Sequence, residues 1–198
     1  LEQIEEQDYE KNTTIYQICY EGLIKSCKAL ETEDYVNKLL KHVNIIEGLS
    51  LLKSFYYVEI AEKYLSFDTD AAIHYAIQSL NLLLINKELN INELNIDWQN
   101  DVGSFSHTWN TITILAQAYF KRYQEASNVI DLKQSVQCFK ASIDILNTIL
   151  NSYKAEGSKL SLNEQLPKTF GTAIKALTLL EPMDYLTQTF QFIEAGKA

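Results

Sequence analysis

Apolar residues recur every three or four positions along almost the whole chain, which is the period of an α-helix with one buried face. The clearest example is the segment after Asp131, where polar residues follow one side and apolar residues the other. The polar row is Lys133, Gln137, Lys140, Asp144, Asn147 and Asn151, and the apolar row is Val136, Phe139, Ile143, Leu146 and Ile149. This pattern predicts a half-buried helix.

Capping residues and breaks divide the chain into about eight such helices. We expect them over residues 14–30, 34–47, 50–67, 71–87, 105–127, 131–153 and 161–180, with a last helix that Pro182 opens. Asp68 and Thr69 form the expected turn and N-cap before the fourth helix. The segment 88–104 is the longest interruption, and we expect it to be an ordered loop that lays apolar residues on the helices.

Composition supports an all-α fold. The chain has six glycines and two prolines in 198 residues, too few for the regular turns of β-sandwiches or doubly wound α/β folds. A hydrophobic content of 46% is that of a globular protein and excludes wholesale disorder. The only methionine is Met183 and the chain begins at Leu1, so we expect residues 1–198 to be a single domain of a longer protein.

Two pairs of the expected helices share a pattern of large, small and aromatic residues. The first helices carry Tyr57, Ile60, Ala61 and Tyr64 in one pair and Ile112, Leu115, Ala116 and Tyr119 in the other; the second helices carry Ala72, Tyr75 and Ser79, and Ser135, Phe139 and Ser142. This resembles the tetratricopeptide repeat, and the resemblance implies a right-handed α-α superhelix of antiparallel hairpins. The repeats are irregular, because their turns differ in length and no proline follows the second helix of either pair.

A second resemblance covers residues 70–84, 105–119 and 135–146. These stretches, with the Asn-rich insertion between the first two, are similar to the non-catalytic helical region of separases, in which irregular hairpins precede a protease domain. The His and Cys motifs of that protease are not present in this sequence. The resemblance implies a scaffold that engages the inhibitor securin and contacts other domains of the same long chain.

Charge and hydropathy exclude several classes of partner. The chain has 17 basic and 26 acidic residues, a formal charge of −9, and Arg122 is its only arginine, so we expect no nucleic-acid binding. The longest aliphatic run, Leu82–Ile85, is too short to cross a membrane, and no cationic leader opens the chain. Cys19, Cys27 and Cys138 are odd in number and lie among apolar residues, which favours a reducing interior in the cytoplasm or nucleus.

No pattern of catalytic or metal-binding residues is present, and we expect neither a metal nor a cofactor. Of the three histidines, His74 lies in a solvent-facing row and His42 has no carboxylate at ligand spacing. His107 lies between Ser106 and Thr108 and could serve as a base for a nearby hydroxyl, but helix capping explains Ser104 and Ser106 better. We therefore predict a non-catalytic segment.

The predicted site is a partner-binding groove on the first helices of the two repeats. Mapping the repeat onto the second pair places Asn110, Thr113, Gln117 and Lys121 on this inner face, and the equivalent residues of the first pair are Phe55, Val58, Glu59, Glu62 and Ser66. The first set is polar and the second apolar and acidic, so it lacks the Lys and Asn with which family members clamp carboxylate tails. We expect a protein or peptide segment to bind there; a solvated face that touches nothing remains the alternative.

A competing hypothesis is a small helical enzyme or ligand-binding bundle. Its pocket would lie under the loop 88–104, with Trp98 and Trp109 as walls. A deep closed cavity there would favour this hypothesis, and an open concave groove would favour the scaffold.

Overall fold

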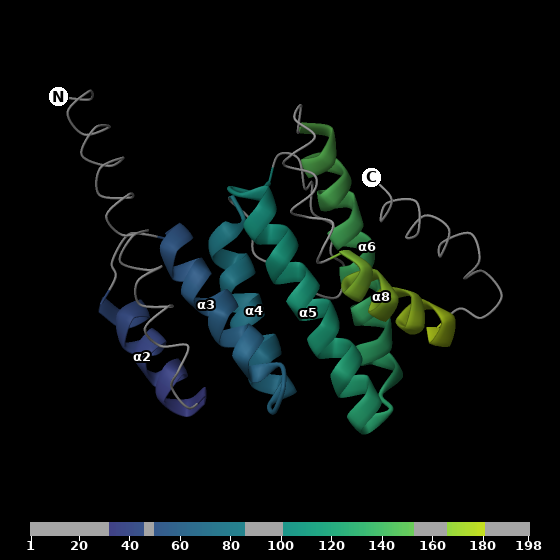
Figure 1. Ribbon diagram of the computed structural model, residues 1–198, viewed down its shortest axis with the longest axis horizontal. Coiled ribbons are helices and arrows are strands. Elements are labelled where there is room, and N and C mark those ends of the chain that lie inside the picture. The colour runs from purple at the N-terminus through teal and green to yellow at the C-terminus, as the bar shows by residue number, and fades with distance from the viewer. Residues whose placement is uncertain (1–31, 46–49, 86–100, 153–165, 181–198) are drawn as a thin grey trace.

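The computed structural model describes residues 32–45, 50–85, 101–152 and 166–180 (Figure 1). Within these residues the chain forms six helices: α2 (Thr32–Ile45), α3 (Ser50–Tyr64), α4 (Thr69–Leu83), α5 (Phe105–Ala126), α6 (Val129–Ser152) and α8 (Leu166–Leu180). The described part has no β-strand, only an isolated antiparallel bridge between Leu84 and Val102. The predicted all-α class is therefore confirmed. The helices predicted over 14–30 and after Pro182 lie outside the described residues.

Short turns join these helices into two hairpins, α3–α4 and α5–α6. In the turn between α3 and α4 the side chain of Asp68 accepts a hydrogen bond from the backbone N–H of Ala71 at 2.9 Å, which caps α4 as predicted. In the second turn Ser127 takes the left-handed conformation with φ of 55°, and the side chain of Asn128 accepts the N–H of Ile130 at 3.0 Å. Both second helices begin two residues before the predicted positions.

Small residues allow the helices of each hairpin to pack closely. Ala61, Ala72 and Ala116 are fully buried, as the repeat pattern predicts. The hydroxyl of the buried Ser135 donates to the backbone carbonyl of Ala116 at 2.8 Å, so a short side chain of α6 bonds directly to the backbone of α5. Side chains of this size leave room for the neighbouring helix, whereas a larger one would displace it.

The first helices of the two hairpins, α3 and α5, run parallel and touch near both ends. Near their starts the rings of Phe55 and His107 stack with centroids 3.8 Å apart. Near their ends the ammonium of Lys121 donates to the carbonyls of Leu65 at 2.9 Å and Ser66 at 2.7 Å. Helix α4 packs against both, and Figure 1 shows α2 to α6 side by side in chain order. Helix α8 packs on α6.

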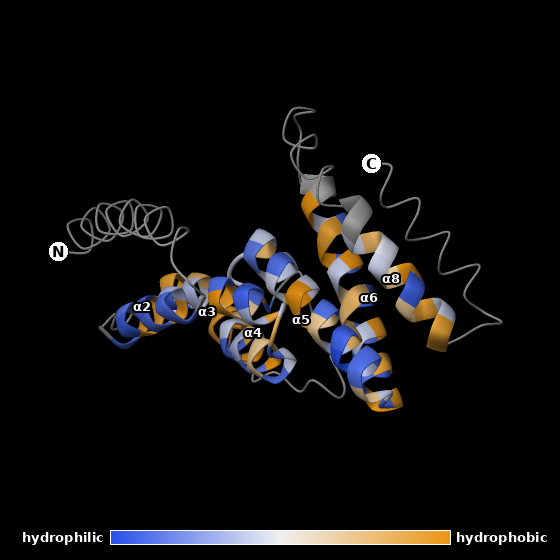
Figure 2. Ribbon diagram, turned by 60° about the horizontal axis from the view of Figure 1, so that its bottom comes forward, coloured by the Kyte–Doolittle hydropathy of each residue, from blue (hydrophilic) through white to orange (hydrophobic). Residues whose placement is uncertain are grey.

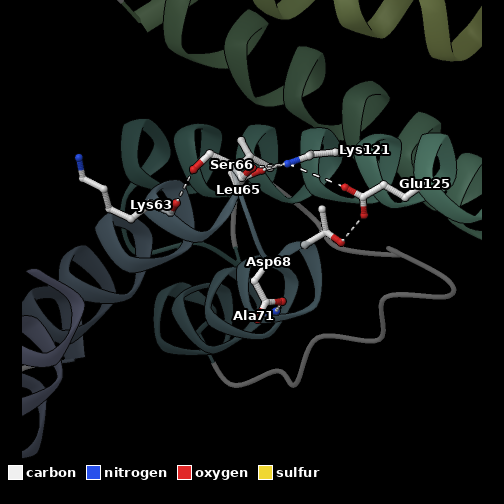
Figure 3. Close-up of polar contacts among 8 residues, drawn as sticks. Lys63, Leu65, Ser66, Asp68, Ala71, Lys121 and Glu125 are labelled. Carbon is white, nitrogen blue, oxygen red and sulfur yellow. Dashed lines mark hydrogen bonds and ion pairs between the residues drawn. The ribbon is translucent and has the colours of Figure 1, made fainter. Parts of the chain in front are cut away.

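A polar clasp joins the two hairpins at the end where their turns lie. Arg122 donates to Asp70 in the first turn of α4 and to Asp131 in the first turn of α6, each at 2.6 Å. One helical turn further along α5, Glu125 accepts the hydroxyl of Thr69 at 3.1 Å. Figure 3 shows the neighbouring part of this clasp, with Lys121 pointing from α5 into the turn after α3. Acidic side chains are favourable at helix N-termini, and here one guanidinium pairs with an acidic side chain at the N-terminus of each of two helices.

The buried apolar residues form two clusters that meet at tyrosines. The larger cluster extends from α3 through α8, and the smaller lies between α2 and α3. Tyr64 and Tyr75 pack against both, and their rings stack at 5.7 Å with planes 9° apart. Hydrophilic and hydrophobic residues alternate along each helix in Figure 2, as a bundle of half-buried helices requires.

The two carboxylates of the clasp allow a matched test of burial. Asp70 and Asp131 lie at the same 2.6 Å from Arg122, but their side chains are 79% and 4% exposed. We expect Asp70→Asn to cost about 0.2–1 kcal/mol of unfolding free energy, as for an exposed ion pair. Asp131→Asn is expected to cost more, about 2–4 kcal/mol, because solvent screens the buried pair less. Urea unfolding of both variants measures the difference, and equal costs would contradict it.

Candidate partner-binding surface

The predicted site residues of α5 share one broad face of that helix, but they differ in exposure. Asn110 and Gln117 are seven residues apart, so they lie on the same face, and both are partly exposed. Thr113 is 6% exposed, and its hydroxyl bonds to that of Ser142 on α6 at 2.8 Å. Three positions after Asn110 and four before Gln117, it is turned far enough to enter the α5–α6 interface. Thr113 is thus not available to a partner at the surface.

Lys121 is partly exposed, but the neighbouring hairpin holds its ammonium. Its bonds to the carbonyls of Leu65 and Ser66 satisfy groups that the end of α3 leaves without helical partners. The ammonium of Lys121 also lies 3.9 Å from the carboxylate of Glu125, one turn further along α5. The structure therefore places Lys121 in the contact between hairpins.

The predicted residues of α3 are divided in the same way. Val58 is buried in the core. Phe55 is half-buried and stacks on His107, whereas the carboxylate of Glu59, also half-buried, accepts the hydroxyl of Tyr35 at 3.0 Å. Glu62 is exposed.

The exposed parts of the two predicted rows lie on neighbouring helices, because α3 and α5 are in contact. Phe55 and Asn110 occupy equivalent repeat positions, as do Glu62 and Gln117. The contact between Phe55 and His107 joins one end of this surface, and that between Lys121 and Ser66 joins the other. We call the surface formed by Phe55, Glu59, Glu62, Asn110 and Gln117 the α3–α5 strip. It offers one aromatic ring, two carboxylates and two amides.

The sequence raised a hydroxyl beside His107 and favoured helix capping as the role of Ser104; for the Ser104 side chain that expectation is wrong. Ser104 is the N-cap residue of α5, as expected, but its side chain makes no bond to the helix backbone. Its hydroxyl lies 2.8 Å from Nδ1 of His107 instead. Burial lowers the pKa of His107, which favours the neutral imidazole. The spacing Ser-x-x-His at the positions of a capping box is the signal that could have indicated this pair.

The other histidines and the described cysteine make contacts that are explained by packing. His74 is exposed against the edge of Tyr75, as predicted, and His42 is exposed and stacks on Tyr56. Cys138 is buried and unpaired, and burial raises the pKa of its thiol, so it behaves as a core residue. Cys19 and Cys27 lie outside the described residues. No group of metal-ligating side chains occurs in the described part of the chain.

The pocket of the competing hypothesis involves one described residue. Trp109 is buried in the larger core cluster, and Trp98 with most of the loop 88–104 lies outside the described residues. The ends of that interruption are held together, because Ile85 donates to the carbonyl of Asp101 at 2.7 Å and Gly103 to that of Leu83 at 2.9 Å. A surface hollow of about 560 Å³ lies elsewhere, lined by α2 residues Asp34, Asn37, Lys38, Leu40, Lys41 and Asn44.

Comparison of the chain with models of protein families, with curated proteins and with solved structures finds no match. Among the described residues no helix has the length and apolar character needed to cross a bilayer.

The inward position of Thr113 leads to a test by paired substitution. Thr113→Val leaves the hydroxyl of Ser142 buried without a partner, and we expect a loss of about 1–3 kcal/mol in unfolding free energy. Adding Ser142→Ala removes that second hydroxyl, so the double variant should recover part of the loss. Urea unfolding of the wild type, both single variants and the double variant gives the coupling. Strict additivity would contradict the assigned hydrogen bond.

Proposed function

We propose that this chain is a non-catalytic scaffold with a tetratricopeptide-like arrangement of hairpins, and that it binds a protein or peptide segment. The observation that carries the proposal is the side-by-side contact of the parallel helices α3 and α5, which touch near their starts and near their ends. Helical repeats stack equivalent helices in parallel, so that their exposed sides form one continuous surface. The right-handed superhelix, and further repeats on either side, belong to this proposal.

The α3–α5 strip suits an extended partner segment. The amides of Asn110 and Gln117 can each donate and accept, and therefore can pair with the N–H and C=O groups of an extended backbone. Phe55 offers a partly exposed ring to an apolar side chain of the partner. Apolar contact would supply most of the affinity, and the amides would fix the register of the bound segment.

The parent protein is proposed to be a separase-like protease of chromosome segregation, acting inside the cell. This part of the proposal rests on the sequence resemblance of residues 70–84, 105–119 and 135–146. In such a protein the segment would engage a securin-type inhibitor and other domains of the same chain, and the protease centre would lie elsewhere.

The amides of the strip provide the experimental test. The double variant Asn110→Ala with Gln117→Ala should lose most of its partner capture, because both side chains that would pair with a bound backbone are removed. Both residues are partly exposed, so the thermal unfolding midpoint should change little. Capture by the immobilised chain, quantified by mass spectrometry beside a melting curve, measures both effects.

Helix α6 offers a matched control. Gln137 and Asn147 are exposed on its outer side, and the variant Gln137→Ala with Asn147→Ala removes the same two chemical groups. Its capture should equal that of the wild type. If the α5 double variant captures the same proteins at wild-type level, the strip is not the binding surface.

A further inference from the structure

Two different kinds of contact hold α3 and α5 together, one near each end. At the clasp end Lys121 donates to the two carbonyls that follow α3, while Arg122 and Glu125 hold α5 to the start of α4. The opposite end depends on the stacked rings of Phe55 and His107. Of these groups the imidazole is the one whose ordinary pKa places its charge change near neutral pH.

Two features of the surroundings of His107 favour its neutral form. Its ring is half-buried and stacks directly on Phe55 at 3.8 Å, which removes water from one face. It lies in the first turn of a 22-residue helix, where the helix dipole disfavours a positive charge. Its Nδ1 lies 2.8 Å from the hydroxyl of Ser104, which can donate to Nδ1 or accept from it, so this contact fits either protonation state.

We propose that His107 is a pH-sensitive joint between the two hairpins: its protonation loosens the Phe55 end of the α3–α5 contact while the clasp holds the other end. A charged imidazolium is better solvated in water than in a half-buried stack beside a helix N-terminus. Turning the ring toward solvent would restore its hydration and would separate it from Phe55. The α3–α5 strip would then open from the Phe55 end.

Among the described residues, few charged groups lie on the elements that meet at the joint. On α3, Lys53 precedes Phe55 by two residues, and the carboxylate nearest to Phe55 along the same face is Glu59, one turn on, which accepts the hydroxyl of Tyr35. On α4, no charged or titratable residue follows Tyr75, so the half of α4 that packs beside the start of α5 contributes none.

Two further carboxylates lie on the neighbouring elements. Asp101 precedes α5 at the Leu84–Val102 bridge, and Asp144 is an exposed residue of α6. Neither forms an ion pair with His107 within the described residues. Asp101 is the closer in sequence, so Asp101→Asn is included below to measure its influence.

The sign of the pH dependence follows from linkage. Burial lowers the pKa of His107 in the folded chain below the unfolded value of about 6.5. As the pH falls below that value, the loosened or unfolded state takes up a proton before the closed state does. The ratio of closed to loosened molecules therefore falls by up to about tenfold per pH unit across this window, and the fall ends below the lowered pKa.

The test uses the full chain. A proton–carbon NMR titration, with the signal of His107 assigned by its absence in His107→Gln, should show His107 titrating below the unfolded value of about 6.5. Asp101→Asn should leave it below that value. Hydrogen exchange followed by mass spectrometry, corrected for intrinsic rates, should show lost protection in residues 50–58 and 104–112 as the pH falls. Residues 62–70 and 119–126 at the clasp should keep theirs.

Variants separate the joint from general acid unfolding. His107→Gln keeps a hydrogen-bonding side chain that does not titrate, and should abolish the loss of protection. His74→Gln, at an exposed position, should leave it unchanged. The proposal is overturned if His107 titrates at or above the unfolded value of about 6.5, if both ends of the α3–α5 contact loosen equally, or if His107→Gln retains the acid response. The titration of the wild type decides the first point even if the variant folds poorly.

Discussion

The relative position of the two hairpins depends on a guanidinium that two helix N-termini share. Asp131 is almost fully buried, and burying a carboxylate costs free energy unless a cation or several donors compensate for its lost hydration. Arg122 provides that compensation from α5, and its second nitrogen binds Asp70 of the other hairpin. Hydrogen bonding to Asp131 in turn raises the pKa of the guanidinium. The need to keep Asp131 paired therefore fixes where α5 ends relative to both α4 and α6.

Between the two ends, close packing rather than charge sets the helix spacing. Ser79 of α4 lies within 3.1 Å of the hydroxyl of Ser54 on α3 and 3.3 Å of that of Thr111 on α5. A hydroxyl at this junction is short enough to let three helices approach, and it finds partners on each side. Buried polar groups of this kind are favourable in one arrangement and costly in any other, so they specify the register of the helices.

The helices could be predicted from the sequence because helical periodicity is a local property. The residues that make the hairpins close were also predictable, since small side chains at Ala61 and Ala116 recur at equivalent positions. The surroundings of the site residues could not be predicted in the same way. That Lys121 caps α3 depends on a turn more than fifty residues earlier in the chain, and the partner of Ser104 depends on a ring that Phe55 holds in place.

Thr113 shows how narrow the boundary is between surface and core on α5. At about 100° per residue, Thr113 lies about 60° around the helix from Asn110 and about 40° from Gln117, which is enough to turn its side chain into the α6 interface. Asn110 and Gln117 are two turns apart and stay on one side, whereas Thr113 and Lys121 are committed to neighbouring helices. Substitutions at the first two positions can therefore change what the surface recognises with little effect on the fold. Substitutions at the other two alter the contacts that place the surface, so a loss of binding there would not by itself identify a partner contact.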